Sequence, residues 1–156
     1  MQFSVREDIE APVDVVFARF SDFAHFERVA LRRGAEVDRM DPSLRAEAGA
    51  RWMVRFKFRG KSREVLIRIA EMDPPNGYTI ATTSNGIEGV TTAEFVPLSP
   101  ARTRLTFAAE LKPRTLPARI VMQSLKLAKG RMDERLRTRI TDYARDIEAG
   151  WHDGQL

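Results

Sequence analysis

Hydrophobic and polar residues alternate along two stretches of the chain, a pattern that is typical of half-buried β-strands. The first stretch comprises residues 2–10, and the second comprises residues 51–59. The hydrophobic positions of the second stretch are Trp52, Val54, Phe56 and Phe58. The positions between them are mostly Arg or Lys, so this strand is expected to have one aromatic face and one cationic face.

Turn signals divide the middle of the chain into further strands. Gly60-Lys61 predicts a hairpin turn after residue 59, and Asn76-Gly77 and Asn85-Gly86 predict two more turns. The strands expected in addition to the two above are 35–40, one through Val65, Ile67 and Ile69, then 78–84, 87–97 and 103–111. Residues 41–50 are expected to form a loop. The result is an antiparallel meander of about six or seven strands.

Two short helices are predicted directly after the first strand. Hydrophobic residues recur at steps of three and four after Pro12, which suits a first helical turn. Ser21-Asp22 can cap a second helix, in which Phe23 and Phe26 occupy one side. Gly34 is expected to end this pair of helices.

A long helix is predicted at the C-terminal end. Thr115 can cap it, and Pro117 fits its first turn. Its hydrophobic positions, at steps of three and four, are Leu125, Ala128, Met132, Leu136, Ile140, Tyr143 and Ile147. With more than thirty residues it would span about 45 Å or more at about 1.5 Å per residue. Gly130 is expected to interrupt it.

The order of these elements predicts a single α+β domain over residues 1–156, with residues 150–156 as a flexible tail. A strongly twisted antiparallel sheet can wrap around one long amphipathic helix. We therefore expect a curved sheet closed by the C-terminal helix.

Four features of this order resemble the START/Bet v 1-like (SRPBCC) superfamily. They are the Ala11-Pro12 break after the first strand, the Val16-Phe17 pair, the segment 73–75 with sequence Asp-Pro-Pro, and the terminal helix. The chain is most similar to small bacterial members described as polyketide cyclase/dehydrase-like or carbon-monoxide-dehydrogenase-subunit-G-like. The resemblance implies a helix-grip fold with a cavity for lipids, isoprenoids or polyketides. Members of the superfamily include cyclases, hydrolases, transporters, sensors and co-chaperones, so the fold leaves the function open.

The composition narrows the chemistry that is available. The chain has no cysteine, which excludes disulfides, thiolate metal sites and a cysteine nucleophile. Charged residues begin at Arg6 and no apolar leader precedes them, so a cytoplasmic protein is expected. The two histidines, His25 and His152, lie far apart in the sequence, and no nucleotide, cofactor or metal motif is present. No cofactor or metal is therefore expected.

Positive charge is concentrated in two segments. Residues 51–69 carry +6 and residues 112–139 carry +7, against a net charge of +4 for the whole chain. Such segments can be solvated surface, or they can contact an anionic membrane or an acidic protein. Nucleic acid is not expected as a partner, because the basic strand face lacks the interleaved aromatic residues of a single-strand platform.

The expected cavity lining comes from the aromatic strand face, its neighbours and the helix. These residues are Trp52, Phe56, Phe58, Ile67, Phe107, Leu125, Lys129, Met132 and Leu136. Lys129 falls inside the apolar helix stripe, where it could pair with a carboxylate or phosphate of the ligand. Alternatively, its stem packs and its ammonium group reaches water.

Three functions follow as hypotheses. The first is a binding or carrier protein for a small hydrophobic ligand that can be anionic. The second is a cyclase, dehydratase or hydrolase that uses Glu94 or Tyr78, provided that these side chains point inward. The third is a docking module without catalysis, in which the basic strand face and a second apolar helix side at Leu116, Ile120 and Leu127 contact an anionic membrane or an acidic protein. This second helix side could also serve as a lid or as a contact with a second copy of the chain.

Overall fold

The computed structural model describes residues 1–41 and 45–156 and confirms the α+β class. Its elements in chain order are β1 (Gln2–Ile9), α1 (Val13–Phe20), α2 (Phe23–Arg32), β2 (Glu36–Arg39), β3 (Arg51–Phe58), β4 (Lys61–Asp73), β5 (Gly77–Ser84), β6 (Ile87–Ser99), β7 (Arg102–Pro113), α3 (Leu116–Leu127) and α4 (Lys129–His152). Of the loop expected at 41–50, residues 42–44 lie outside the described residues. The remainder of that stretch contains neither helix nor strand.

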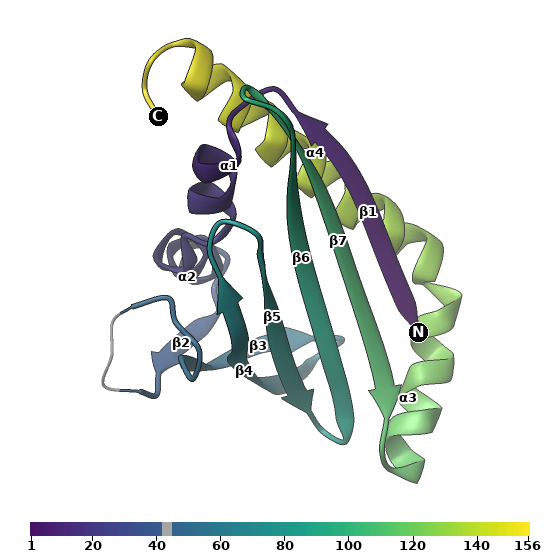
Figure 1. The fold of residues 1–156 in the computed structure, drawn as a ribbon. Helices are drawn as coiled ribbons and strands as arrows, with labels where there is room; N and C mark the ends of the chain where they lie inside the picture. The colour runs from purple at the N-terminus through teal and green to yellow at the C-terminus, as the bar shows by residue number, and fades with distance from the viewer. Residues whose placement is uncertain (42–44) are drawn as a thin grey trace.

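The seven strands form one antiparallel sheet in the order β1-β7-β6-β5-β4-β3-β2. The predicted sheet of about six or seven strands is therefore confirmed. Pairing between β4 and β5 shifts between Ile69 and Glu71, where an extra residue bends the strand. Figure 1 shows β1 beside α4, with β3 and β4 turned away from the direction of β6 and β7. The sheet is thus strongly curved.

The hairpin between β3 and β4 turns one residue earlier than predicted. Arg59 and Gly60 have φ angles of 52° and 76°, and Lys61 pairs with Phe58. A two-residue turn of this kind needs positive φ at both central positions, so Gly60 occupies the second position and not the first. The turn predicted at Asn85-Gly86 is confirmed, with φ angles of 46° and 79°.

The two short helices after β1 are also confirmed. Pro12 has extended backbone angles and precedes the first helical residue, so it lies one position before the first turn in which it was expected. The carboxylate of Asp22 accepts a hydrogen bond of 3.1 Å from the amide of His25 and caps α2. Gly34 follows α2 with a φ of 90°, a conformation that suits glycine.

The predicted long C-terminal helix is confirmed, but its interruption lies at Ala128, between α3 and α4, and not at Gly130. The Ala128 amide bonds to the carbonyl of Leu125 at 3.0 Å, three residues back, and this tightens the end of α3. Gly130 lies within α4. The 24 residues of α4 span about 36 Å. No helix among residues 1–41 and 45–156 is long and apolar enough to cross a membrane.

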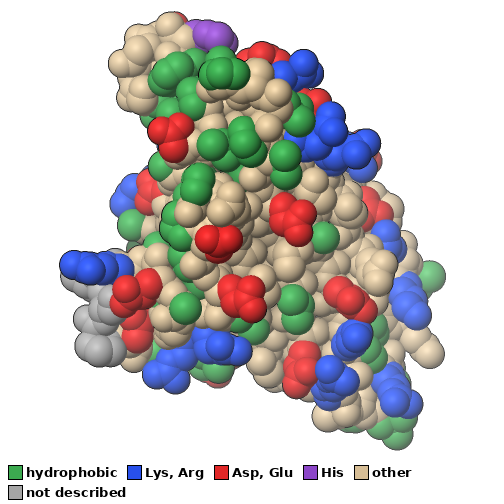
Figure 2. All heavy atoms as spheres, in the orientation of Figure 1, with side chains coloured by type: hydrophobic (Ala, Val, Ile, Leu, Met, Phe, Trp, Pro, Cys, Tyr) green, Lys and Arg blue, Asp and Glu red, His purple; other side chains and the backbone are tan. Residues whose placement is uncertain are grey.

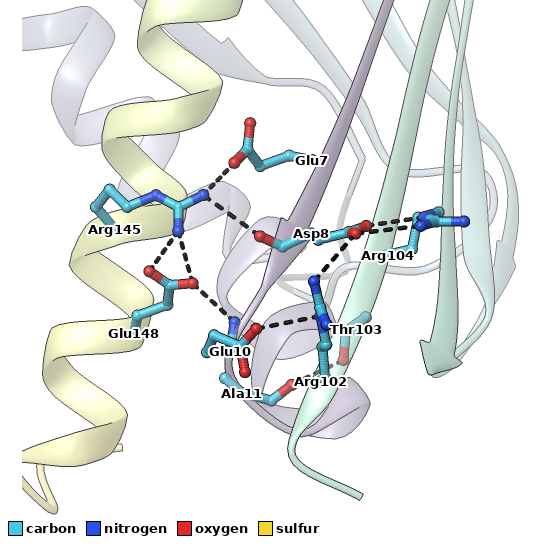
Figure 3. A network of polar contacts seen from close by, with 9 residues as sticks. All are labelled: Glu7, Asp8, Glu10, Ala11, Arg102, Thr103, Arg104, Arg145 and Glu148. Carbon is cyan, nitrogen blue, oxygen red and sulfur yellow. Dashed lines mark hydrogen bonds and ion pairs between the residues drawn. The ribbon is translucent and has the colours of Figure 1, made fainter. Parts of the chain in front are cut away.

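A polar network fixes the C-terminal half of α4 to the end of β1 (Figure 3). Arg145 donates to the carboxylates of Glu7 and Glu148 and to the carbonyl of Asp8. Glu148 in turn accepts a 2.8 Å hydrogen bond from the amide of Glu10. On the core side of the same half of α4, Ala144 and nearby Ile residues are buried. The helix is therefore anchored by both charge and packing at this end.

Candidate ligand-binding pocket

A pocket of about 720 Å³ lies between the concave face of the sheet and the helices α2 and α4. This volume falls within the range of about 300–1,000 Å³ that is usual for small-molecule sites. The hydrophobic lining residues are Phe20, Phe23, Phe26, Val29, Ala30, Val37, Trp52, Val54, Ile67, Ile80, Phe107, Leu136 and Ile140. The interior is therefore predominantly apolar.

Strand register builds the floor of the pocket. Trp52 of β3 pairs with Ile67 of β4, which pairs with Thr82 of β5. Directly opposed residues share one face of an antiparallel sheet, so these three side chains form a row. A neighbouring row runs from Ile80 to Thr91. Alternation along each strand thus supplies every second residue to the floor.

Aromatic side chains form the wall nearest to α2. The ring of Phe23 lies 5.6 Å from that of Trp52 and 5.5 Å from that of Tyr78, centroid to centroid. The ring of Phe26 lies 5.7 Å from that of Tyr143 on α4. None of the residues in α2 is fully buried. This helix is therefore held mainly by partly buried contacts, several of them at the pocket wall.

The hydroxyl groups of both pocket tyrosines donate to backbone carbonyls. Tyr78 donates to the carbonyl of Phe20, and Tyr143 donates to that of Arg19, each at 2.7 Å. Burial raises the pKa of Tyr78 far above its ordinary value, and burial also raises the pKa of Tyr143. The two side chains thus tie the end of α1 to the sheet and to α4, and they stay protonated at neutral pH.

Trp52 is fixed where α2 meets the sheet. Its indole N–H donates to the carboxylate of Glu27 on α2. The guanidinium carbon of Arg39 lies 4.4 Å from the centroid of the Trp52 ring, a cation–π contact. The tryptophan therefore joins α2 to the sheet and keeps one orientation.

Two hydroxyl groups on the floor have no hydrogen-bond partner among the residues that the structure describes. Thr82 and Thr91 line the pocket, and within the described residues neither side chain makes a hydrogen bond to the protein. Both side chains are only partly buried, so their hydroxyl groups are open to the pocket space. A ligand hydroxyl, carbonyl or carboxyl group could supply the missing partner.

Charged side chains surround the mouth between α2 and α4. They are Glu27, Arg33, Arg139, Asp142 and Asp146, together with the imidazole of His25. The His25 ring stacks on that of Tyr143, with 5.9 Å between the centroids and 17° between the planes. Within the described residues, no group of three or more His, Asp or Glu side chains is placed to hold a metal ion. The mouth is polar and the interior is apolar, as in many small-molecule sites.

Four of the nine residues expected in the cavity lining meet in this pocket. They are Trp52, Ile67, Phe107 and Leu136. The other five do not line it. Phe56 lies on the same face of β3 but beyond the pocket, towards the β3–β4 hairpin, and Phe58 is 44% exposed near the tip of that hairpin. Leu125 and Met132 are half-buried at the end of α3 and the beginning of α4.

The structure places Lys129 away from this pocket. Its Nζ atom forms an ion pair of 2.7 Å with Asp133 and lies 5.2 Å from the centroid of the Phe3 ring on β1. The first turn of α4 lies over β1 at the edge of the sheet, whereas the pocket lies further along the helix, beside Leu136 and Tyr143. The hydrophobic stripe of the helix indicated the side of α4 on which Lys129 lies. It did not indicate how far along α4 the pocket lies.

The contribution of α2 to the wall was missed by the sequence reasoning. Phe20, Phe23 and Phe26 recur every third residue, and this spacing could have indicated an aromatic row facing one cavity. Tyr143 was treated only as a helix core position. Glu94, one of the two catalytic candidates, is exposed on the outer side of the sheet, whereas Tyr78 points inward. The part of the pocket wall between α2 and α4 therefore depends on contacts between residues that lie far apart in the sequence.

Comparison with known proteins agrees with this geometry. The family model described as polyketide cyclase / dehydrase and lipid transport matches residues 1–145. A crystal structure from Thermus thermophilus is similar with a TM-score of 0.68 and 16% identity, over 96% of this chain and 99% of that one. Among curated protein sequences, none matches this chain.

Two similar structures have described activities. The Zhui aromatase/cyclase from Streptomyces sp. R1128 has a TM-score of 0.67 and 12% identity, over 96% of this chain and 94% of that one. Norcoclaurine synthase from Thalictrum flavum has a TM-score of 0.61 and 12% identity, over 79% of this chain and 75% of that one. At these identities the likeness shows the fold alone, whereas the family model over residues 1–145 confirms the resemblance to polyketide cyclase/dehydrase-like proteins.

Proposed function

The chain belongs to the polyketide cyclase/dehydrase and lipid transport family, and from this premise we propose that it binds or carries a small hydrophobic ligand between the sheet and α4. The observation that carries the proposal is the pocket of about 720 Å³ with an apolar interior. Pockets of this size enclose most of a drug-sized ligand, and burial of apolar surface drives binding.

The polar groups inside the pocket favour a ligand with few hydrogen-bonding groups. Thr82 and Thr91 offer unpaired hydroxyls on the floor. One or two oxygen atoms on an otherwise apolar molecule would satisfy them. Ligands of this class include a lipid with a terminal carboxyl group, an isoprenoid alcohol and a polyketide.

The inward-facing polar side chains favour a binding function over catalysis by proton transfer. The Tyr78 and Tyr143 hydroxyls are engaged with backbone carbonyls, and a raised pKa makes each a poor proton donor near neutral pH. Glu27 is engaged with the indole of Trp52. Each of these groups has a structural partner that accounts for its position.

The test uses cis-parinaric acid, a fluorescent fatty acid, with a matched pair of variants. Thr91→Phe places a large apolar side chain in the pocket, whereas Thr92→Phe places the same side chain on the opposite face of β6. We expect saturable binding of one probe per chain, weakened at least about tenfold by Thr91→Phe and unchanged by Thr92→Phe. Circular dichroism confirms that both variants are folded.

Native mass spectrometry of the protein purified from its own source completes the test. A copurifying apolar molecule that is absent from Thr91→Phe supports the proposal. If the wild-type chain binds no probe and carries no such molecule, the proposal is wrong. Equal loss of binding in both Phe variants would place the probe outside the pocket and would also contradict it.

A further inference from the structure

Helix α3 exposes a row of large apolar side chains. Leu116, Ile120 and Leu127 are 71%, 66% and 91% exposed, respectively. Single exposed leucines are common on protein surfaces, but a contiguous apolar row often marks a contact site. The row was expected from the sequence, and the structure confirms that it is exposed.

Helix geometry shows that this row points directly away from the protein. At about 100° per residue, the three side chains fall within a sector of about 40°. Ala118 and Met122, which are 2% and 3% exposed, lie on the opposite side of the helix and pack against the body of the protein. The row is thus the outermost surface of α3.

Positive charges border the row on both sides. Arg119 and Lys126 lie along one side by the same helical geometry. On the other side, Arg59 of the β3–β4 hairpin donates to Ser124 Oγ of α3 at 2.8 Å. Phe58, which is 44% exposed, precedes Arg59 in the same hairpin. The hairpin therefore extends the apolar and basic surface of α3.

The same surface is poor in carboxylates. No Asp or Glu occurs in residues 111–132 or in residues 56–63. Glu88 and Glu110, close to the start of α3, are paired with Arg114 and Lys112. The two most basic segments of the chain thus meet at the contact between Arg59 and Ser124. Figure 2 shows Lys and Arg side chains beside hydrophobic ones at the lower right end of the molecule, where Figure 1 places α3.

We propose that α3 and the β3–β4 hairpin dock on the surface of a membrane that contains anionic phospholipids. An amphipathic helix of this kind places its apolar side chains at the acyl boundary while its Lys and Arg side chains contact lipid phosphates. A second copy of the chain fits less well, because self-pairing of this face would bring cations together without carboxylates to neutralise them. An anionic membrane therefore accounts for both the apolar row and the cationic residues that border it.

This docking surface is separate from the ligand pocket. The pocket mouth lies beside Arg139 and Asp146, which follow Lys129, the first residue of α4, by 10 and 17 positions. The docking proposal therefore does not rest on the proposed ligand. A failure of probe binding and a failure of membrane binding would be independent results.

The test is co-sedimentation of the full chain with vesicles. One set contains phosphatidylcholine and phosphatidylglycerol, and the other contains phosphatidylcholine alone. We expect binding only to the anionic set, with release at high salt. Leu127→Asp combined with Ile120→Asp should weaken binding at least tenfold. Charge reversal at Arg119 and Lys126 should weaken it by about fivefold or more per residue, from the usual contribution of one cation near an anionic surface.

Two control variants test whether the vesicles bind at α3. Val90→Asp changes a residue that is 50% exposed on β6, and Arg28→Glu changes an exposed arginine of α2. Both should bind like the wild-type chain, and all variants should keep the wild-type melting temperature. The proposal is overturned if anionic vesicles are not bound, or if the controls weaken binding as much as the α3 variants. It is also overturned if sedimentation shows a dimer that Leu127→Asp dissociates.

Discussion

At the scale of single residues, the tyrosines show how one side chain can serve both fold and pocket. Tyr78 and Tyr143 contribute apolar ring surface to the pocket, while their hydroxyls satisfy two carbonyls at the end of α1. A buried carbonyl without a donor would cost about 1–3 kcal/mol. The same bond that shapes the pocket wall therefore also stabilises the connection between α1, the sheet and α4.

The raised tyrosine pKa values predict an alkaline titration that depends on folding. The chain has only these two tyrosines, so absorbance of tyrosinate reports on them alone. In the folded protein the absorbance should rise well above pH 10, whereas in denaturant it should rise near the ordinary pKa of about 10. Because the folded pKa is the higher one, the stabilisation is complete below pH 10 and is lost as the pH rises above it.

The titration is checked by stopped-flow mixing to alkaline pH, which separates ionisation in the folded state from ionisation after unfolding. Tyr143→Phe leaves only Tyr78 and should move the folded-state titration to higher pH still, since burial is the greater at Tyr78. Ordinary titration of both groups near pH 10 in the folded protein would contradict the burial of their hydroxyl groups.

At the scale of secondary-structure elements, two glycines differ in what surrounds them. Gly89 of β6 is buried opposite Thr82, and a Cβ atom there would meet Thr82 Oγ1 and lie 2.9 Å from Leu111 Cδ2. Gly130 of α4 has open space where its Cβ atom would lie. Gly89 thus makes room for the pocket floor, whereas Gly130 has no such role.

Alanine at these two positions should therefore have opposite effects. Gly89→Ala should lower the free energy of unfolding by about 1–3 kcal/mol, as overpacking does. Gly130→Ala should raise it by about 0.5–1 kcal/mol through helix propensity, or about 2–4 °C in melting temperature. Urea unfolding monitored by circular dichroism measures both. A stabilising Gly89→Ala would show that the floor near Thr82 is looser than described.

The elements themselves could largely be predicted from the sequence, because local patterns determine them. Alternation around Trp52 predicted β3 and the face that carries the pocket, and Asn85-Gly86 predicted the turn between β5 and β6. The break at Ala128 could not be predicted, since it depends on one backbone bond to Leu125 and not on a helix-breaking residue. The position of Lys129 was missed for a similar reason. Its side of α4 follows from periodicity, but its neighbours follow from how α4 crosses β1.

At the scale of the whole molecule, the pocket adjoins two hydrophobic clusters. The larger cluster joins α1, α4 and the strands β1 and β5 to β7, and the smaller one contains Ala50, Trp52 and Ile69. Phe23 and Met72 pack against both clusters. Residues of both clusters, including Trp52 and Tyr78, line the pocket, so the pocket lies where the two clusters meet.

The weakest covering of the pocket is α2, and this makes a prediction about where a bound ligand acts. α2 has no fully buried residue, while α4 buries Ile140, Ala144 and Ile147. Segments with few buried contacts open locally at low free energy, and a ligand that packs against such a segment suppresses this opening. Binding of cis-parinaric acid should therefore slow amide hydrogen exchange in α2 much more than in the C-terminal half of α4.

Hydrogen exchange followed by mass spectrometry tests this prediction with and without the probe. In Thr91→Phe the probe should leave the exchange of α2 unchanged, because the variant fills the space that the probe would occupy. Protection confined to α3 would instead place the probe on the exposed row at Leu116 and Leu127. Equal protection of α2 and of the network at Arg145 would show that the probe stabilises the whole molecule. In that case α2 does not open separately from the rest of the protein, and the prediction is wrong.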